Sequence, residues 1–206
     1  MSIEKRSERR RRRSPEEAKR EALASARGLL IAGGPDAVTL AAVASELGVT
    51  HANLIHHFGS AAGLQSALMG SMVNDLADAL DAVVGRLRTD RGAPLELVSE
   101  VFKAFDEGGA ARLAAWIVLS GDLRHLEPIR AAVQGLVEAI RERLGDKDGL
   151  ARARISAAVL LIAVSAFGDA LIGPPLRDML DRPDDATRKV IAGLLPHFLV
   201  EHPGGA

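Results

Sequence analysis

The chain has 206 residues, a formal net charge of −1 and no cysteine. The lack of cysteine excludes disulfides, thiol nucleophiles and cysteine-ligated zinc, and it fits a reducing cytoplasm. Aromatic residues make up only 3% of the chain, and the abundance of alanine and leucine favours helices over sheets. We therefore expect a cytoplasmic all-α protein.

The first residues of the chain form a basic arm. Residues 1–27 hold ten basic and five acidic side chains, whereas the remainder of the chain holds sixteen basic and twenty-two acidic ones. We expect residues 1–13 to be disordered; they end in Arg9, Arg10, Arg11, Arg12 and Arg13. No apolar stretch follows, so this is not the pattern of a signal peptide. A basic end on an acidic body indicates a nucleic-acid partner. The alternative is a solvated tail that binds nothing.

Four helices are predicted in the first part of the chain. The first begins at Ser14-Pro15-Glu16-Glu17, which combines a capping serine, a proline in the first turn and a capping box, and it ends at Gly33-Gly34-Pro35. Two short helices follow, from Thr39 to Gly48 and from Thr50 to about His57. A long helix is capped by Ser60 and keeps its apolar spacing to Arg88.

Five further helices are predicted from apolar periodicity, which gives about nine helices in all. They lie at about 94–106, 110–120, 125–144, 149–172 and 184–200. We expect Gly173-Pro174-Pro175 to separate the last two. The most apolar segment, Ile155 to Gly173, is interrupted by two serines and by Asp169. It is too short and too rich in small residues to suit a bilayer, so a buried helix is predicted there.

Residues 39–58 have the pattern of a helix-turn-helix. Gly48 can take a positive φ, which allows the chain to reverse steeply between the two short helices. Ala44 is small where the helices must cross closely, and apolar residues on both sides of the turn are spaced to fill the crossing. This spacing predicts a helix-turn-helix, although many helical hairpins share parts of it.

The stretch TLAAVASELGVTHANLIHHFGSAAGL, residues 39–64, resembles the TetR family of bacterial transcription regulators. It has a threonine-led second helix, the A-x-x-x-G-V-[ST] turn, a third helix that ends in His-Phe, and a serine-led start to the fourth. The resemblance covers about the first quarter of the chain. It implies a helix-turn-helix DNA-binding domain over residues 14–59 and a helical ligand-binding and dimerisation domain over residues 60–206.

Two residues depart from the family pattern. Ile55 stands where the family usually has a tyrosine, and Ala61 stands where it usually has a lysine; both family residues contact DNA phosphates. Moreover, no lysine or arginine occurs from Gly28 to Gly85. Because DNA affinity rests largely on phosphate neutralisation, we expect Arg9 to Arg13 to supply much of it, along the backbone or in the minor groove.

Candidate DNA contacts follow from the two short helices. The starts of these helices can bind phosphates through hydroxyl groups and backbone amides. Asparagine pairs well with adenine, histidine can donate to guanine, and alanine can touch a thymine methyl. The candidate residues are Thr39, Thr50, His51, Ala52, Asn53, Ile55 and His56. A plain solvated helix face is the alternative for each of them.

Metal binding and catalysis have little support in the sequence. His56 and His57 are adjacent, so their side chains diverge on a helix, and His51 is five residues from His56, which is also a poor spacing for a shared metal. There is no phosphate-binding glycine loop and no nucleophile elbow. We therefore predict no catalytic residue, no metal and no cofactor.

The resemblance also implies an effector cavity and a dimer interface in the larger domain. The candidate cavity walls are Phe102, Phe105, Trp116, Leu119 and Phe167, although for any one of them a place in the core is favoured. In the family the last two large helices of each subunit form a four-helix interface. The helix at 149–172 offers one apolar stripe, Ile155, Val159, Ile162 and Ala166, and a neighbouring stripe, Leu160, Val164, Phe167 and Leu171. We assign the first stripe to the interface, together with Ile191, Leu194, Leu195 and Phe198.

The sequence thus predicts a homodimeric, ligand-responsive repressor that an apolar or amphipathic small molecule releases from double-stranded operator DNA. Two alternatives remain open. One is a helical binding protein whose arginine-rich end contacts nucleic acid or membrane non-specifically. The other is a small helical enzyme, which would need a polar, convergent pocket.

Overall fold

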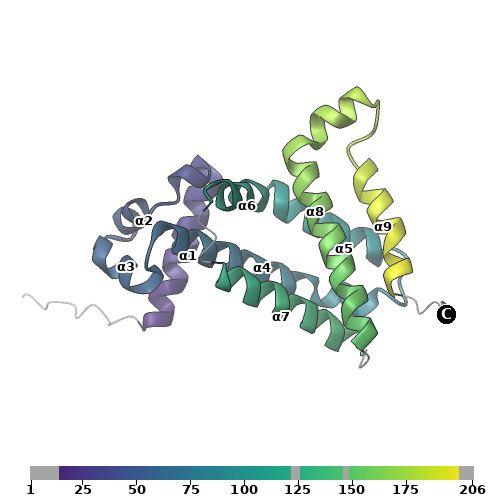
Figure 1. The fold of residues 1–206 in the computed structure, drawn as a ribbon, viewed down its shortest axis with the longest axis horizontal. Coiled ribbons are helices and arrows are strands. Elements are labelled where there is room, and N and C mark those ends of the chain that lie inside the picture. The colour runs from purple at the N-terminus through teal and green to yellow at the C-terminus, as the bar shows by residue number, and fades with distance from the viewer. Residues whose placement is uncertain (1–13, 122–125, 146–148, 200–206) are drawn as a thin grey trace, which may run out of the picture.

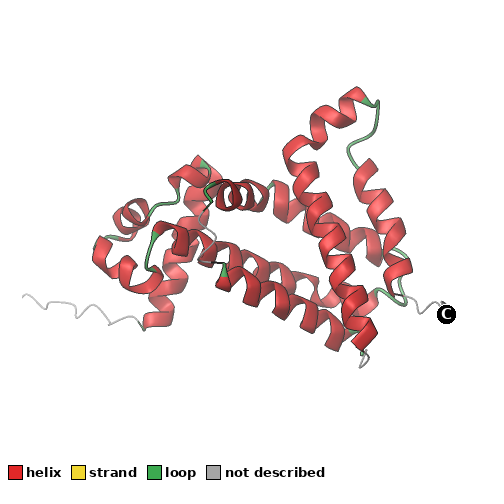
Figure 2. Cartoon of the chain, viewed as in Figure 1, coloured by secondary structure: helices red, strands yellow, loops and turns green. Residues whose placement is uncertain are grey.

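The computed structural model describes residues 14–121, 126–145 and 149–199, and within these ranges the protein is all-helical, as predicted (Figure 2). Nine α-helices and one short 3-10 helix lie in these ranges, without a strand. They are α1 (Pro15–Gly33), η1 (Pro35–Ala37), α2 (Leu40–Leu47), α3 (His51–Phe58), α4 (Ala61–Arg86), α5 (Ala93–Asp106), α6 (Ala110–Leu119), α7 (Glu127–Arg143), α8 (Gly149–Met179) and α9 (Ala186–Leu199).

Side-chain caps set the starts of the first helices. Ser14 and Glu17 form a reciprocal capping box on α1, with the Glu17 amide donating to the Ser14 hydroxyl at 3.1 Å. Thr39 caps α2, Thr50 caps α3 and Ser60 caps α4, each by accepting a hydrogen bond from the amide three residues later. These local contacts explain why the sequence predicts the boundaries so closely.

Two hydrophobic cores lie at opposite ends of the molecule. The N-terminal core joins α1, α2 and α3 to the first half of α4 and to α6; its fully buried members include Leu30, Val43, Leu54, Leu64 and Leu113. The C-terminal core joins the second half of α4 to α5, α7, α8 and α9. The helix α4 therefore runs from one core into the other, with α7 packed along it (Figure 1).

The helix α8 is longer than the sequence predicts. It continues through Gly173-Pro174-Pro175 to Met179, so the expected break there is wrong. Each proline removes one backbone donor from the helix. A nearly buried polar cluster bridges this segment: the carboxylate of Asp169 accepts hydrogen bonds from the guanidinium of Arg177 and, at 2.8 Å, from the hydroxyl of Thr187 on α9.

The predicted burial of the apolar segment in α8 holds for only one of its faces. Ile155, Ile162 and Ala166 are buried in the C-terminal core, whereas Leu160 is 65% exposed and Val164 is 61% exposed. By length and hydropathy this helix could cross a membrane, but a helix in the core of a soluble protein passes the same test. Within the described ranges, Val164 packs in neither hydrophobic core.

Candidate nucleic-acid interface and effector cavity

The turn between α2 and α3 sets the angle of the third helix. Gly48 ends α2 in the left-handed region, at φ 61° and ψ 36°, where only glycine rests without strain. The Val49 amide then donates to the Ala44 carbonyl at 3.0 Å and closes the turn. Leu54 and Phe58 of α3 are buried against the N-terminal core, so the opposite face of α3 points away from the protein.

The outer face of α3 carries the residues that the sequence singles out. His51, Ala52, Asn53 and His56 are exposed, and Ile55 is 47% exposed. This face lies at the end of the molecule farthest from α9 (Figure 1). The structure therefore groups these five side chains on one accessible helix surface of the size that enters a DNA major groove.

The two threonine hydroxyls lie at the exposed starts of α2 and α3. Thr39 accepts a hydrogen bond from the Ala42 amide at 3.1 Å, and Thr50 accepts one from the Asn53 amide at 3.3 Å. Each hydroxyl uses an oxygen lone pair in this way and keeps its hydrogen for donation. A phosphate oxygen at either helix start would be a suitable acceptor.

Fixed positive charge is absent from α2 and α3. Both helices lack lysine and arginine, and the described cations of the N-terminal helices all lie on α1, namely Lys19, Arg20 and Arg27. Arg9, Arg10, Arg11, Arg12 and Arg13 lie outside the described residues. No group of histidine, aspartate and glutamate side chains in the described ranges is arranged to hold a metal ion.

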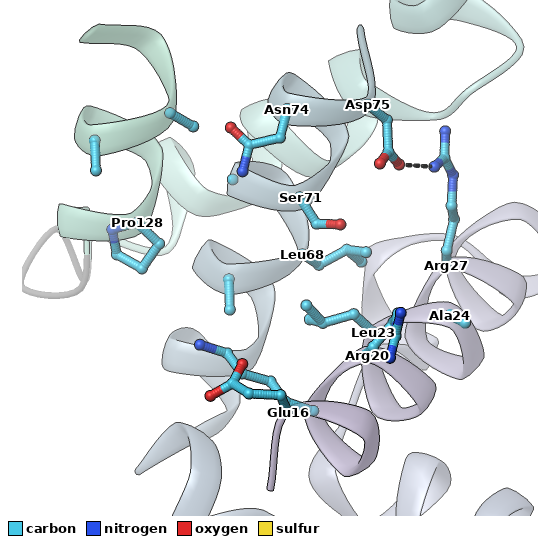
Figure 3. Close-up of a pocket in the computed structure, with 15 residues that line it drawn as sticks. Glu16, Arg20, Leu23, Ala24, Arg27, Leu68, Ser71, Asn74, Asp75 and Pro128 are labelled. Atoms are coloured by element: carbon cyan, nitrogen blue, oxygen red, sulfur yellow. Dashed lines mark hydrogen bonds and ion pairs between the residues drawn. The ribbon is translucent and has the colours of Figure 1, made fainter. Parts of the chain in front are cut away.

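Two polar contacts tie α4 to the N-terminal helices. The buried amide of Gln65 donates to the Val38 carbonyl at 3.2 Å, just before α2. In a groove of about 680 Å³ between α1, α4 and α7, the guanidinium of Arg27 donates to the carboxylate of Asp75 at 2.6 Å (Figure 3). An exposed pair of this kind contributes only about 0–1 kcal/mol to stability.

A cavity of about 480 Å³ lies in the larger domain between α4, α5, α7 and α8. Its wall is mostly apolar and includes Leu76, Leu80, Val101, Val137 and Ile140. The polar residues of the lining are Gln134, Arg152 and Ser156, from α7 and α8. The volume falls within the usual range for small-molecule sites.

The predicted cavity residues are only partly brought together. Phe105 lines the cavity, but Phe102 is 2% exposed in the C-terminal core, with the Arg188 guanidinium 5.9 Å from its ring centre. Trp116 and Leu119 lie exposed on α6, and like Phe167 they do not line the cavity. Apolar side chains of α4 and α7 form much of the cavity wall.

The predicted interface stripe faces inward and needs correction. Ile155, Ile162, Ala166, Ile191 and Leu195 are buried in the protomer's own core, and Val159 lines the cavity. Leu194 is 41% exposed, and the side chain of Phe198 lies outside the described residues. In the neighbouring stripe, Leu160, Val164 and Leu171 are exposed, and Leu160 also lines the cavity. Sequence periodicity shows that α8 has two apolar stripes, but only tertiary packing shows which one the protomer itself covers.

Comparison with known proteins agrees with this architecture. Residues 22–68 match the family model for bacterial regulatory proteins of the tetR family. The fold is similar to that of the multidrug binding protein EbrR complexed with ethidium, with a TM-score of 0.64 and 16% identity over 90% of this chain and 99% of that chain.

Two further solved structures assigned to TetR-family regulators are also similar in fold. One is from Mesorhizobium loti MAFF303099, with a TM-score of 0.50 and 18% identity over 91% of this chain and 98% of that chain. The other is from Shewanella sp. PV-4, with a TM-score of 0.53 and 20% identity over 86% of this chain and 95% of that chain. No protein of curated function matches the chain in sequence. Residues 22–68 thus match the N-terminal segment of the tetR family of bacterial regulatory proteins, and the fold of the whole chain is similar to that of solved structures assigned to this family.

Proposed function

We propose that the protein is a homodimeric repressor that reads operator DNA with α3 and leaves it when a small apolar or amphipathic molecule fills the cavity. The observation that carries this proposal is the course of α4. Leu64 and Leu68 fix its first half in the N-terminal core, whereas Leu76 and Leu80 of its second half line the cavity. One continuous helix therefore connects the DNA-reading surface to the cavity wall.

A ligand acts on such a protein by shifting the equilibrium between a form that binds DNA and a form that does not. A dimer reads two half-sites about one turn of DNA apart, so the separation of the two α3 helices decides whether both fit. A molecule that binds better to the wrongly spaced form favours that form and releases the DNA. The neighbouring structure of EbrR was solved with ethidium, which supports an effector role for a cavity in this fold. TetR-family regulators are generally not enzymes, and we propose no catalytic activity.

The DNA-reading surface of this proposal rests on the exposed side chains of α3 and on the basic arm. Thr39, Thr50, His51, Ala52, Asn53, Ile55 and His56 form its described part. Asn53 has a side chain that can pair with an adenine edge through two hydrogen bonds, and such a pair contributes about 1–3 kcal/mol of discrimination. Residues 9–13 supply the phosphate contacts.

Gel-shift competition tests this function directly. The protein is bound to DNA from upstream of its own gene and challenged with the same DNA or with random DNA. We expect only the specific DNA to compete well, and we expect Asn53→Ala to lose about 10-fold to 100-fold of this preference. The matched control is Asn74→Ala, an exposed asparagine of α4 away from α3. Equal displacement by random DNA would support the rival view of a non-specific arginine-rich protein.

A further inference from the structure

The cavity between α4, α5, α7 and α8 has one wholly apolar wall and one amphipathic wall. The residues contributed by α4 and α5 are all apolar, whereas α7 contributes the amide of Gln134, and α8 contributes Arg152 and Ser156. Arg152 and Ser156 are one helical turn apart and so lie on the same face of α8. No aspartate or glutamate lines this cavity.

The guanidinium of Arg152 is available to a ligand. Other arginines nearby are engaged: Arg141 pairs with Glu138, and Arg143 lies 3.6 Å from Asp81. No carboxylate of the described residues forms an ion pair with Arg152, which lies three residues after the start of α8. The helix dipole adds partial positive charge at that end. Among the described residues, the cavity lining thus holds one cation, Arg152, and no carboxylate.

The carboxylate of Glu138 on α7 interacts electrostatically with Arg152. Its pKa is held below the usual range, first by the hydrogen bond from Arg141, with only a lesser contribution from the charge of Arg152. Since Glu138 already accepts hydrogen bonds from Arg141 at 3.0 and 3.1 Å and does not line the cavity, it leaves Arg152 free to bind another anion.

We infer that the cavity takes a lipophilic carboxylate, with its apolar body against α4 and α5 and its carboxylate on Arg152; this rests on the proposed effector role of the cavity. A guanidinium binds a carboxylate through two parallel hydrogen bonds, and Ser156 and Gln134 add further donors on the same wall. A lipophilic cation finds no carboxylate in this lining, and Arg152 repels it. Burying such a charge without a partner is costly.

Binding of three probes that share a ten-carbon chain tests the charge preference. Decanoate, decanol and decyltrimethylammonium are titrated into the full-length protein below their micelle concentrations, and binding is measured by calorimetry. We expect decanoate to bind about 10-fold to 100-fold more tightly than either of the other two, the range given by a hydrogen bond to a charged group. Cation binding equal to or tighter than that of decanoate overturns the inference, and so does the absence of binding by all three.

Two variants test whether the preference for decanoate depends on the side chain of Arg152. Arg152→Gln removes the charge, and we expect it to abolish the advantage of decanoate over decanol, because decanoate loses far more affinity than decanol. Arg154→Gln makes the same change two residues along α8, at a side chain that does not line the cavity, and should preserve the advantage. Thermal unfolding of both variants verifies that they are folded. An unchanged advantage in Arg152→Gln contradicts the inference.

A gel shift with added ligand tests the inferred ligand class and the proposed effector role separately. If decanoate binds through Arg152 but leaves the gel shift of upstream DNA unchanged, the ligand class holds and the effector role of the cavity fails. If a cationic probe releases the DNA instead, the effector role holds and the inferred ligand class is wrong.

Discussion

At the scale of single residues, one glycine sets how closely α4 and α7 approach. Gly70 of α4 is buried, and a Cβ atom placed there would lie 2.8 Å from the carbonyl oxygen of Pro128 and 3.1 Å from its carbonyl carbon. Both are backbone atoms at the start of α7, so they cannot move aside as a flexible side chain can. The contact joins the start of α7 to α4 close to the N-terminal core.

We therefore predict that Gly70→Ala destabilises the protein. The gain in helix propensity is about 1 kcal/mol, but forcing α4 and α7 apart costs about 1–3 kcal/mol, so the free energy of unfolding should fall. The matched control is Gly135→Ala in α7, where nothing lies within 4 Å of the added Cβ and stability should rise by up to about 1 kcal/mol. Urea unfolding measures both; a Gly70→Ala protein as stable as Gly135→Ala contradicts this account of the crossing.

At the scale of elements, α8 is a helix with two apolar faces and a partner for only one of them. Val164 and Leu171 lie on its outer face, and on α9 Val190 and Leu194 are also exposed. Exposed apolar side chains on two packed helices of this kind favour an interaction site. We propose that a second copy of the chain covers it, since a two-fold dimer uses the same surface on both subunits.

A charge on this outer face should separate the subunits. We predict that Val164→Asp converts the dimer to a monomer in analytical ultracentrifugation with no loss of helical circular dichroism, because Val164 is already 61% exposed within the protomer. Val118→Asp provides the control, since Val118 is 64% exposed but lies on α6; this variant should stay dimeric. A Val164→Asp protein that sediments like the unsubstituted chain would place the interface elsewhere.

At the scale of the whole molecule, the features that the sequence predicts are the local ones. The caps of Ser14, Thr39 and Ser60 and the reversal at Gly48 depend on neighbouring residues alone, so the boundaries of the first helices follow from the sequence. The exposed face of α3 follows as well, because the buried position of Leu54 fixes which side faces solvent.

The features that escaped prediction depend on distant contacts. The helix α8 continues through its prolines, and Asp169 and Arg177 on either side of them form a polar cluster with Thr187 of α9. The inward stripe of α8 is inward because α5 and α9 pack on it, and the cavity wall is assembled from four helices. Residue spacing along one helix carries no information on which neighbour will cover a given face.

The balance of charge over the whole chain gives a further prediction. Because α2 and α3 lack fixed cations, deletion of residues 1–13 should weaken DNA binding severely and flatten its salt dependence. Each lost phosphate contact reduces the slope of log affinity against log salt by about 0.9. The slope is measured by fluorescence anisotropy between low and physiological salt. An intact slope in the truncated protein would show that the arm does not neutralise phosphates.

Above all, we expect the outer face of α3 to read a specific DNA sequence, with the two α3 helices of a dimer each reading one half-site. Footprinting of the purified protein on genomic DNA of its source tests this most directly. The account predicts discrete protected sites made of two inverted half-sites, with centres about one turn of DNA apart. Protection spread evenly over the DNA, without a recurring sequence, would contradict it.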